Sequence, residues 1–189
     1  MKILSLWQPW ATLIAAGAKH IETRNWATHY RGELAIHAAK KWDGELQFTC
    51  LTEPFRTALR EAGYPHANCY GLPFGFIVAM ATLIDCCSTV DMIPDPAYPC
   101  AFRKYPTLDT PNERAFGNYE PGQWAWVFGK IMPLRQPISY KGGQGLRNLD
   151  PEVERRVREL AMPCLHWKRE PDGSGYRCAE PGCPQFTPF

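Results

Sequence analysis

Residues 4–26, LSLWQPWATLIAAGAKHIETRNW, place a short strand, a helix and a charged strand in immediate succession. Residues 2–6 read as a strand, and residues 8–17 carry apolar side chains at helical spacing. Pro9 falls in the first turn of that helix, where its missing N–H costs nothing. Gly17 suits the position just beyond the helix end. The chain therefore passes from a helix straight into the charged segment HIETR.

The rest of the chain reads as short strands with interspersed helices. Pro54 lies inside one predicted helix and is expected to kink or divide it. Residues 91–122 are rich in proline and predict a long irregular loop, and residues 141–149 predict a flexible basic turn. Without a repeating strand–helix unit, this pattern indicates an α+β protein built on a small mixed β-barrel. We predict further strands over 32–40, 74–86 and 123–134, and helices over 43–62 and 150–160.

Composition sets limits on function. The 189 residues are 45% hydrophobic, enough for a core, and the net charge of +2 is too small to indicate nucleic-acid binding by itself. Residues 1–42 hold six Lys or Arg against two Glu, an excess of four positive charges that favours an anionic partner. The sequence contains neither a signal-peptide pattern nor 18 consecutive apolar residues. We therefore expect a cytoplasmic protein without membrane contact, of unspecified oligomeric state.

The charged strand allows two interpretations. Strand alternation puts Glu22 and Arg24 on one face, and Lys19 joins them only if the chain bends after Gly17. In one interpretation, Glu22 and Arg24 form a buried pair that tethers the strand. In the other, the charges line a ligand cleft. There, Lys19 and Glu22 would be catalytic as a proton-transferring or nucleophilic pair, or they would contact a phosphate and a base amine.

Further polar and aromatic residues surround this strand in sequence. Trp7 and Gln8 lie at the strand-to-helix turn, where an indole can stack on a base and an amide can read a base edge. Arg24 can hold a phosphate with two hydrogen bonds. The predicted ligand-binding residues are Trp7, Gln8, Arg24, His37, Lys40 and Lys141.

The pattern G-x-K-x-x-E-x-R, present as Gly17, Lys19, Glu22 and Arg24, resembles the signature of the ASCH (activating signal cointegrator homology) family. The segments GELAIHAAKKW, FGFIVAMATLIDC, QWAWVF and PLRQPISYKGGQGL follow in the expected order, so the resemblance covers residues 1–149. It implies a PUA-like mixed β-barrel with flanking helices and a cleft. It also implies recognition of RNA, another single-stranded nucleic acid or a modified nucleoside.

The same family includes amidohydrolases that act on acetylated cytidine with a lysine, a threonine and a glutamate. Lys19 matches the lysine, but Glu22 stands where those enzymes have the threonine, so their mechanism does not transfer directly. A hydrolase of acylated cytidine-like nucleosides, or a ribonuclease that uses Lys19 and Glu22, is the first alternative function. A protein-interaction adaptor is the second. No organic cofactor is expected.

The C-terminal tail differs from the rest in composition. After the helix at 150–160, residues 161–189 predict a short Cys/His-rich appendage that resembles a zinc ribbon. A segment of this size with few apolar residues would be ordered by a structural zinc ion. The predicted Cys₃His ligands are Cys164, His166, Cys178 and Cys183.

Overall fold

The computed structural model describes residues 1–64, 71–92, 94–95, 98–102, 104–161, 167–169 and 176–178. Its centre is a six-stranded sheet in the order β2-β7-β4-β3-β1-β8. Only β1 and β3 pair in parallel, while the other neighbours in this sheet are antiparallel. The six strands are β1 (Lys2–Leu6), β2 (Ile21–Arg24), β3 (Gly32–Ala38), β4 (Phe76–Ser88), β7 (Trp124–Ser139) and β8 (Leu146–Asn148).

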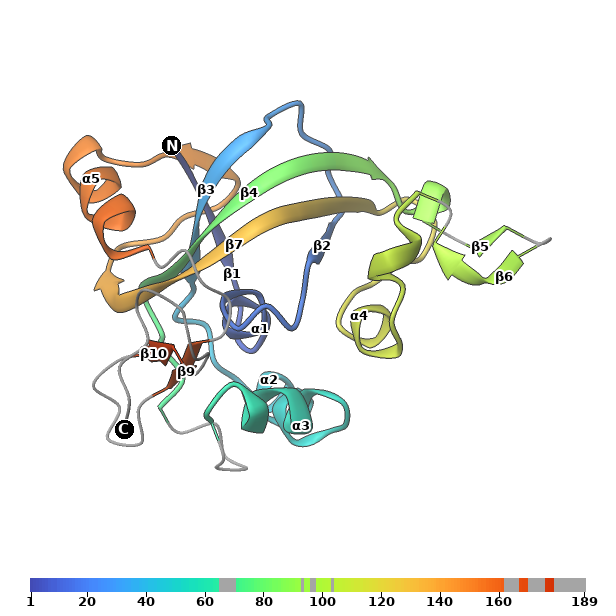
Figure 1. The fold of residues 1–189 in the computed structure, drawn as a ribbon, viewed down its shortest axis with the longest axis horizontal. Coiled ribbons are helices and arrows are strands. Elements are labelled where there is room, and N and C mark those ends of the chain that lie inside the picture. Colours follow the sequence, from blue (N-terminus) through green and yellow to red (C-terminus); the bar gives the residue numbers. More distant parts are fainter. Residues whose placement is uncertain are drawn as a thin grey trace.

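Two long strands curve the sheet into a half-barrel. β4 and β7 pair along most of their length, and their register shifts at three places between Ile77 and Asp85. Each shift is a bulge or irregularity that bends the strand and increases its twist. The two ribbons arch side by side across the molecule in Figure 1, with β3 next to β4 and above it in this view. The predicted α+β class with a mixed, barrel-like sheet is confirmed.

Helices pack on the sheet and on each other. Ala11 and Ile14 of α1 join the main core with strand residues such as Leu34 and Ile36, and Val157 of α5 packs with residues of the opposite face. The predicted helix at 43–62 is divided before Phe55, as Pro54 indicated. The helices are α1 (Trp10–Ala15), α2 (Gly44–Leu51), α3 (Phe55–Glu61), α4 (Pro111–Ala115) and α5 (Pro151–Leu160). None of the described helices is long and apolar enough to cross a membrane.

The expectation of an irregular segment over 91–122 is wrong in part. It contains α4, which begins after Thr110, whose side chain accepts a hydrogen bond from the backbone N–H of Glu113 at 3.0 Å. The sequence TPNE carries the Ser/Thr-x-x-Glu start signal and a proline at the first helical position. The segment also contains the short elements η1 (Thr89–Met92), β5 (Pro94–Asp95), β6 (Tyr98–Phe102) and η2 (Pro106–Leu108).

Two more boundaries differ from expectation. β7 continues to Ser139 instead of ending at residue 134, and the predicted turn at 141–149 contains the edge strand β8. In the tail, β9 (Trp167–Arg169) and β10 (Tyr176–Cys178) pair antiparallel. The zinc prediction lies outside the described residues. The structure describes only the backbone of Cys178, and it does not describe Cys164, His166 or Cys183.

Candidate functional site

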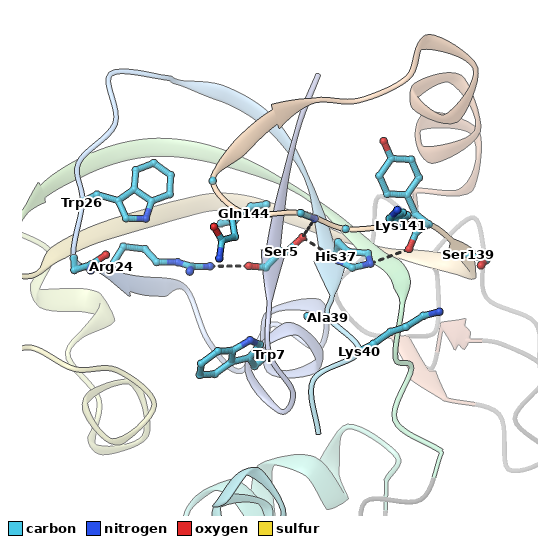
Figure 2. Close-up of a pocket in the computed structure, with 16 residues that line it drawn as sticks. Ser5, Trp7, Arg24, Trp26, His37, Ala39, Lys40, Ser139, Lys141 and Gln144 are labelled. Carbon is cyan, nitrogen blue, oxygen red and sulfur yellow. Dashed lines mark hydrogen bonds between the residues drawn. The ribbon is translucent and has the colours of Figure 1, made fainter. Parts of the chain in front are cut away.

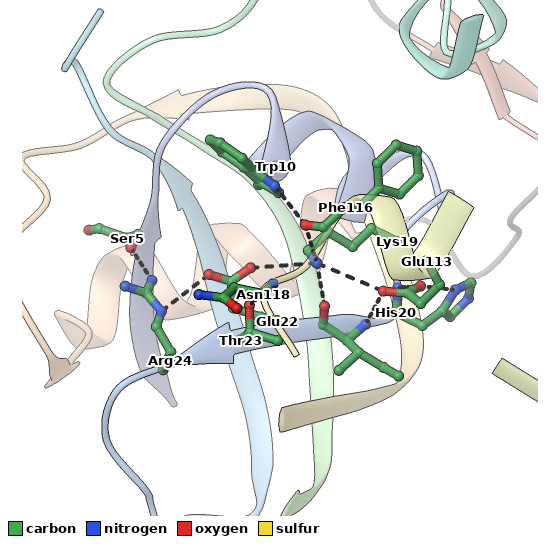
Figure 3. Close-up of polar contacts among 11 residues, drawn as sticks. Ser5, Trp10, Lys19, His20, Glu22, Thr23, Arg24, Glu113, Phe116 and Asn118 are labelled. Carbon is green, nitrogen blue, oxygen red and sulfur yellow. Dashed lines mark hydrogen bonds and ion pairs between the residues drawn. The ribbon is translucent and has the colours of Figure 1, made fainter. Parts of the chain in front are cut away.

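Lys19 is the centre of a fully buried polar cluster. Its ammonium donates hydrogen bonds to the carbonyl of Ile21 and, at 3.0 Å, to the carbonyl of Phe116. Carboxylate oxygens of Glu22 and Glu113 lie 3.9 and 3.8 Å from the same nitrogen. Figure 3 shows these four partners around the Lys19 nitrogen. The cluster joins the end of the α1–β2 turn to α4, nearly 100 residues later in the chain.

Burial and charge act in opposite directions in this cluster. Removal from water lowers the pKa of Lys19, and the neighbouring Glu22 and Glu113 carboxylates oppose that shift. Burial likewise raises the pKa of Glu113, against the pull of Lys19 and of two backbone N–H groups. Such a cluster holds its charges only while every partner is present, because an unpaired buried charge is very costly.

Glu113 is the member of the cluster that the sequence analysis missed. It is buried, and its carboxylate accepts hydrogen bonds from the backbone N–H groups of His20 at 2.7 Å and Ile21 at 3.1 Å. Glu113 therefore satisfies two backbone N–H groups at the start of β2, as the carbonyls of a neighbouring strand would. The helix-start signal TPNE identifies a turn of helix at this position, but nothing in it indicates the partner 91 or more residues away.

Arg24 and Glu22 form the pair expected from strand alternation. Arg24 Nε lies 3.2 Å from a carboxylate oxygen of Glu22, and an Arg24 terminal nitrogen donates to the carbonyl of Ser5 at 2.8 Å. β8 pairs β1 only along Lys2–Leu4, so the Ser5 carbonyl lies beyond that ladder. Arg24 thereby links β2 to β1, two strands that are not neighbours in the sheet.

A cavity of about 1290 Å³ opens beside Arg24. Within the described part of the chain, three cationic side chains line it, those of Arg24, Lys40 and Lys141, and no aspartate or glutamate does. Lys40 and Lys141 are exposed, so their charges remain available to a ligand. The indoles of Trp7 and Trp26 and the residues of the loop Lys141–Gly145 complete the walls, and Figure 2 shows several of these residues around the opening. We call this the cationic cavity.

A smaller cavity of about 400 Å³ adjoins the first and shares Ser5, Trp7 and Arg24 with it. Its other walls come from Trp10, the β2 residues Glu22 and Thr23, and the segment Ala115–Asn118 after α4. The Glu22 carboxylate makes this cavity different from the cationic one. Lys19 lines neither cavity.

The structure brings most of the predicted ligand-binding residues to the cationic cavity. Trp7, Arg24, His37, Lys40 and Lys141 all line it. Trp7 is 49% exposed, and the Lys41 ammonium lies 3.8 Å from the centre of its ring. These residues come from four separate stretches of the chain, so the fold has assembled a surface that their sequence positions only suggested.

The structure does not bring Gln8 to the cavities. Its side chain is fully buried, donates to the carbonyl of Pro73 at 2.9 Å and accepts from the backbone N–H of Thr12 at 3.1 Å. Both ends of the amide are therefore used inside the protein, and Gln8 lines neither cavity. It fixes the start of α1 because it satisfies an N–H of the first turn that has no partner within the helix.

His37 lies on the face of β3 opposite Leu34 and Ile36, where Ser5 and Tyr140 contact its ring. His37 is 2% exposed, although its ring borders the cationic cavity. Burial lowers its pKa, which favours the neutral ring.

The predicted zinc ligands are not tested by this geometry. Within the described ranges, no group of three or more His, Cys, Asp or Glu side chains is placed to hold a metal ion. The structural zinc site in the tail stays a prediction. The catalytic role of Lys19 and Glu22 also stays a prediction, while the Glu22–Arg24 ion pair of the tether interpretation is present.

The described part of the chain is thus a small domain with a curved mixed sheet, flanking helices and an open cavity lined by cationic side chains. The model of the ASCH domain matches residues 4–103, more than half of the chain, so the chain belongs to the ASCH domain family. The expected PUA-like fold class is thereby confirmed, and the motif Gly17–Arg24 falls within the matched range.

Two curated relatives match the chain over 85 residues. Activating signal cointegrator 1 of Homo sapiens is 38% identical over this stretch, which is 45% of this chain and 14% of the relative, and the Mus musculus protein gives the same values. The matched stretch is thus a small part of those proteins.

Among solved structures, the ASCH protein from Zymomonas mobilis matches with a TM-score of 0.48 and 16% identity. The match covers 85% of this chain and 94% of that chain. A variant of the same protein matches with a TM-score of 0.46 and 14% identity.

Proposed function

We propose that this protein binds single-stranded nucleic acid, with RNA as the preferred class, in the cationic cavity. One observation carries the proposal: Arg24, Lys40 and Lys141 line a cavity, and none of the described residues in its walls is an aspartate or a glutamate. Such a surface attracts an anionic backbone, since field lines concentrate in a cavity lined by one sign of charge. Membership of the ASCH family supports the proposal, because the resemblance of that family to PUA domains implies RNA binding.

The aromatic residues of the cavity favour unpaired bases over a duplex. Trp7 presents an exposed indole, and Trp26 and Tyr140 also border the cavity. Stacking on such side chains requires a base that is not already stacked in a helix, and it contributes about 1–3 kcal/mol per base. A duplex is usually read by an element that projects into a groove, whereas this site is concave.

The hydrolase alternative with Lys19 and Glu22 is not favoured. The Lys19 ammonium faces carbonyl and carboxylate oxygens and borders neither cavity, so a substrate in either one has no direct access to it. The same RNA used for binding can be examined on a gel after incubation. Cleavage that disappears in Lys19→Met, with the fold retained, would restore this alternative.

The binding test is a titration of fluorescently labelled 12-nucleotide RNA followed by anisotropy at several salt concentrations. Lys40→Ala and Lys141→Ala are each expected to weaken binding about tenfold. Each is also expected to reduce the slope of log K against log salt by about 0.7, the value for one phosphate contact on a single strand.

Lys130→Ala is the matched control, because Lys130 is exposed on β7 and does not line the cationic cavity. It removes the same charge and is expected to change the affinity less than twofold. Equal losses in all three variants would mean that binding follows net charge and not this cavity. Duplex RNA bound as tightly as single-stranded RNA would contradict the choice of ligand.

A further inference from the structure

The loop Lys141–Gly145, which we call the glycine loop, lies against two polar side chains of the cavity wall. The Ser5 hydroxyl oxygen accepts a hydrogen bond from the Gly143 N–H at 3.3 Å, and it lies 3.0 Å from His37 Nδ1. The other ring nitrogen of His37 lies 3.1 Å from the carbonyl of Tyr140, the residue just before the loop. Figure 2 shows the three contacts as one chain across the cavity wall.

The proton positions in this chain follow from its ends. A carbonyl only accepts, so His37 Nε2 carries the proton and donates it to Tyr140. In the neutral ring Nδ1 then accepts, and the Ser5 hydroxyl donates to it while accepting from Gly143. No donor or acceptor in this chain of hydrogen bonds is therefore used twice. Burial of the ring lowers the pKa of His37 and so favours the neutral form that this arrangement needs. The positive charge of Lys40 also lowers the pKa of His37 and so favours the neutral ring.

The loop backbone also fits the ring sterically. A Cβ atom on Gly142 would lie 2.2 Å from His37 Cε1 and 2.7 Å from the Ser5 hydroxyl oxygen. Hydrogen bonds at both ring nitrogens hold His37 in place, so the ring cannot turn away to make room. Glycine at this position is therefore required for the loop to lie on the ring.

The alternation of β3 explains where His37 lies. Leu34, Ile36 and Ala38 pack in the main core, and His37 is on the opposite face of the strand, together with Ala35. The register shift beside His37 is in β4, where Val78 is the extra residue between the pairing residues Ile77 and Ala79. The backbone around it is linked as well: the Gly75 N–H donates to the carbonyl of Ala38 at 2.7 Å, and the Tyr140 N–H donates to the carbonyl of Gly75 at 3.0 Å.

We propose that His37 is a positioning residue that, with Ser5, clamps the glycine loop and thereby sets the position of Lys141 at the rim of the cationic cavity. In this role His37 does not read the ligand itself. The inference rests on the proposed function for its binding readout, but the clamp is a property of the free protein and is tested without any ligand.

The first test is made on the free protein. Nitrogen-15 NMR of the histidine rings is expected to show His37 as the Nε2–H tautomer, with a ring proton protected from exchange, while the exposed His29 shows none. Protection of the Gly143 amide from hydrogen exchange is expected to fall in Ser5→Ala and His37→Ala. A His37 ring in the Nδ1–H form, or a Gly143 amide indifferent to both variants, would overturn the clamp whatever the protein binds.

The second test asks whether Lys141 depends on the clamp. His37→Ala and Gly142→Ala remove no formal charge at neutral pH, yet each is expected to weaken RNA binding about tenfold and to lower the salt slope as Lys141→Ala does. Adding Lys141→Ala to either variant is then expected to cost less than a further twofold. A full further tenfold loss in the double variants would show that Lys141 acts independently and would overturn the proposal.

Two variants serve as controls for folding. Gly44→Ala places a methyl group where nothing lies within 4 Å, and it is expected to leave binding unchanged. His37→Gln keeps a donor near the position of Nε2 and is expected to restore at least half of the lost affinity. If Gly142→Ala does not fold, Ser5→Ala tests the same coupling, because it removes the acceptor of the Gly143 N–H without added bulk. If Lys40→Ala and Lys130→Ala show that the cavity does not bind RNA, the proposed function fails, and the NMR result alone decides the clamp.

Discussion

Lys19 and the pair Lys40 and Lys141 carry the same ammonium group in opposite surroundings. Lys19 is fully buried, with two carbonyls as hydrogen-bond acceptors and two carboxylates within 4 Å. Lys40 and Lys141 are exposed at a cavity where no carboxylate is found among the described lining residues. The first ammonium has its negative partners inside the protein, so it holds the structure together. The described lining of the cavity offers no carboxylate to Lys40 and Lys141, so both ammonium groups are available to an anionic ligand.

The largest expected difference between the two regions is in stability. Lys19→Met leaves the Glu22 and Glu113 carboxylates and two carbonyls without their common partner, and is expected to lower the free energy of unfolding by about 3–5 kcal/mol. Urea unfolding measures this. Lys41→Met is the control, because the Lys41 side chain is 47% exposed and its pair with Asp43 contributes little. A Lys19 variant that unfolds like wild type but no longer binds RNA would assign Lys19 to the ligand instead.

Asp85 provides a third charged setting, apart from both regions. Although partial burial opposes its ionisation, hydrogen bonds from Lys104 and Tyr105 lower the pKa of Asp85 to about 2. Because the folded-state pKa is depressed, the stabilisation is complete above the ordinary value near 4 and is lost as the pH falls toward 2.

We expect Asp85→Asn to cost about 2 kcal/mol of stability at pH 7 and to flatten the dependence of stability on pH between 4 and 2. RNA affinity is expected to stay unchanged, since Asp85 does not line the cationic cavity. Urea unfolding at a series of pH values measures the first effect. Equal slopes for the variant and the wild type in that pH range would contradict the assigned pKa.

Arg24 belongs both to the cluster around Lys19, through Glu22, and to the lining of the cationic cavity. Its substitution is expected to change stability the least of these variants, but to change both stability and RNA affinity. Lysine in its place keeps the charge but cannot contact Glu22 and the Ser5 carbonyl together with a planar fork. Arg24→Lys is therefore expected to lower stability by about 1 kcal/mol and RNA affinity about threefold. Loss of affinity without any loss of stability would show that Arg24 serves only the ligand.

Several elements were predictable because their information is local. The alternation or helical spacing of β1, α1, β3 and β4 appears within ten or so residues, and Asp150 followed by Pro151 predicts the start of α5, where the Asp150 side chain does accept N–H groups of the first turn. The motif around Lys19 was recognisable as a unit for the same reason. Its partner Glu113 was not, because no periodic pattern relates positions that are 94 residues apart.

Two side chains show the same limit. Gln8 was expected at a ligand because an amide at a strand-to-helix turn suits base recognition, yet the backbone of Thr12 and of Pro73 uses both ends of it. His37 was expected to contact a ligand, and it does lie in the cavity wall, but contacts with Ser5 and Tyr140 bury its ring beneath the glycine loop. Neither the approach of Tyr140 nor that of Pro73 can be read from neighbouring residues.

The sequence by itself determined the class of fold, the family motif and the excess of positive charge near the N-terminus, since periodicity, turn residues and charge are properties of the chain. Only the tertiary structure decided which lysine is satisfied internally and which is left for a ligand. That choice depends on where carbonyls and carboxylates from distant segments come to lie around each ammonium. In this protein Glu113 of α4 supplies a carboxylate to Lys19, and Phe116, the residue after α4, supplies a carbonyl. The described lining of the cationic cavity supplies no carboxylate to Lys40 and Lys141.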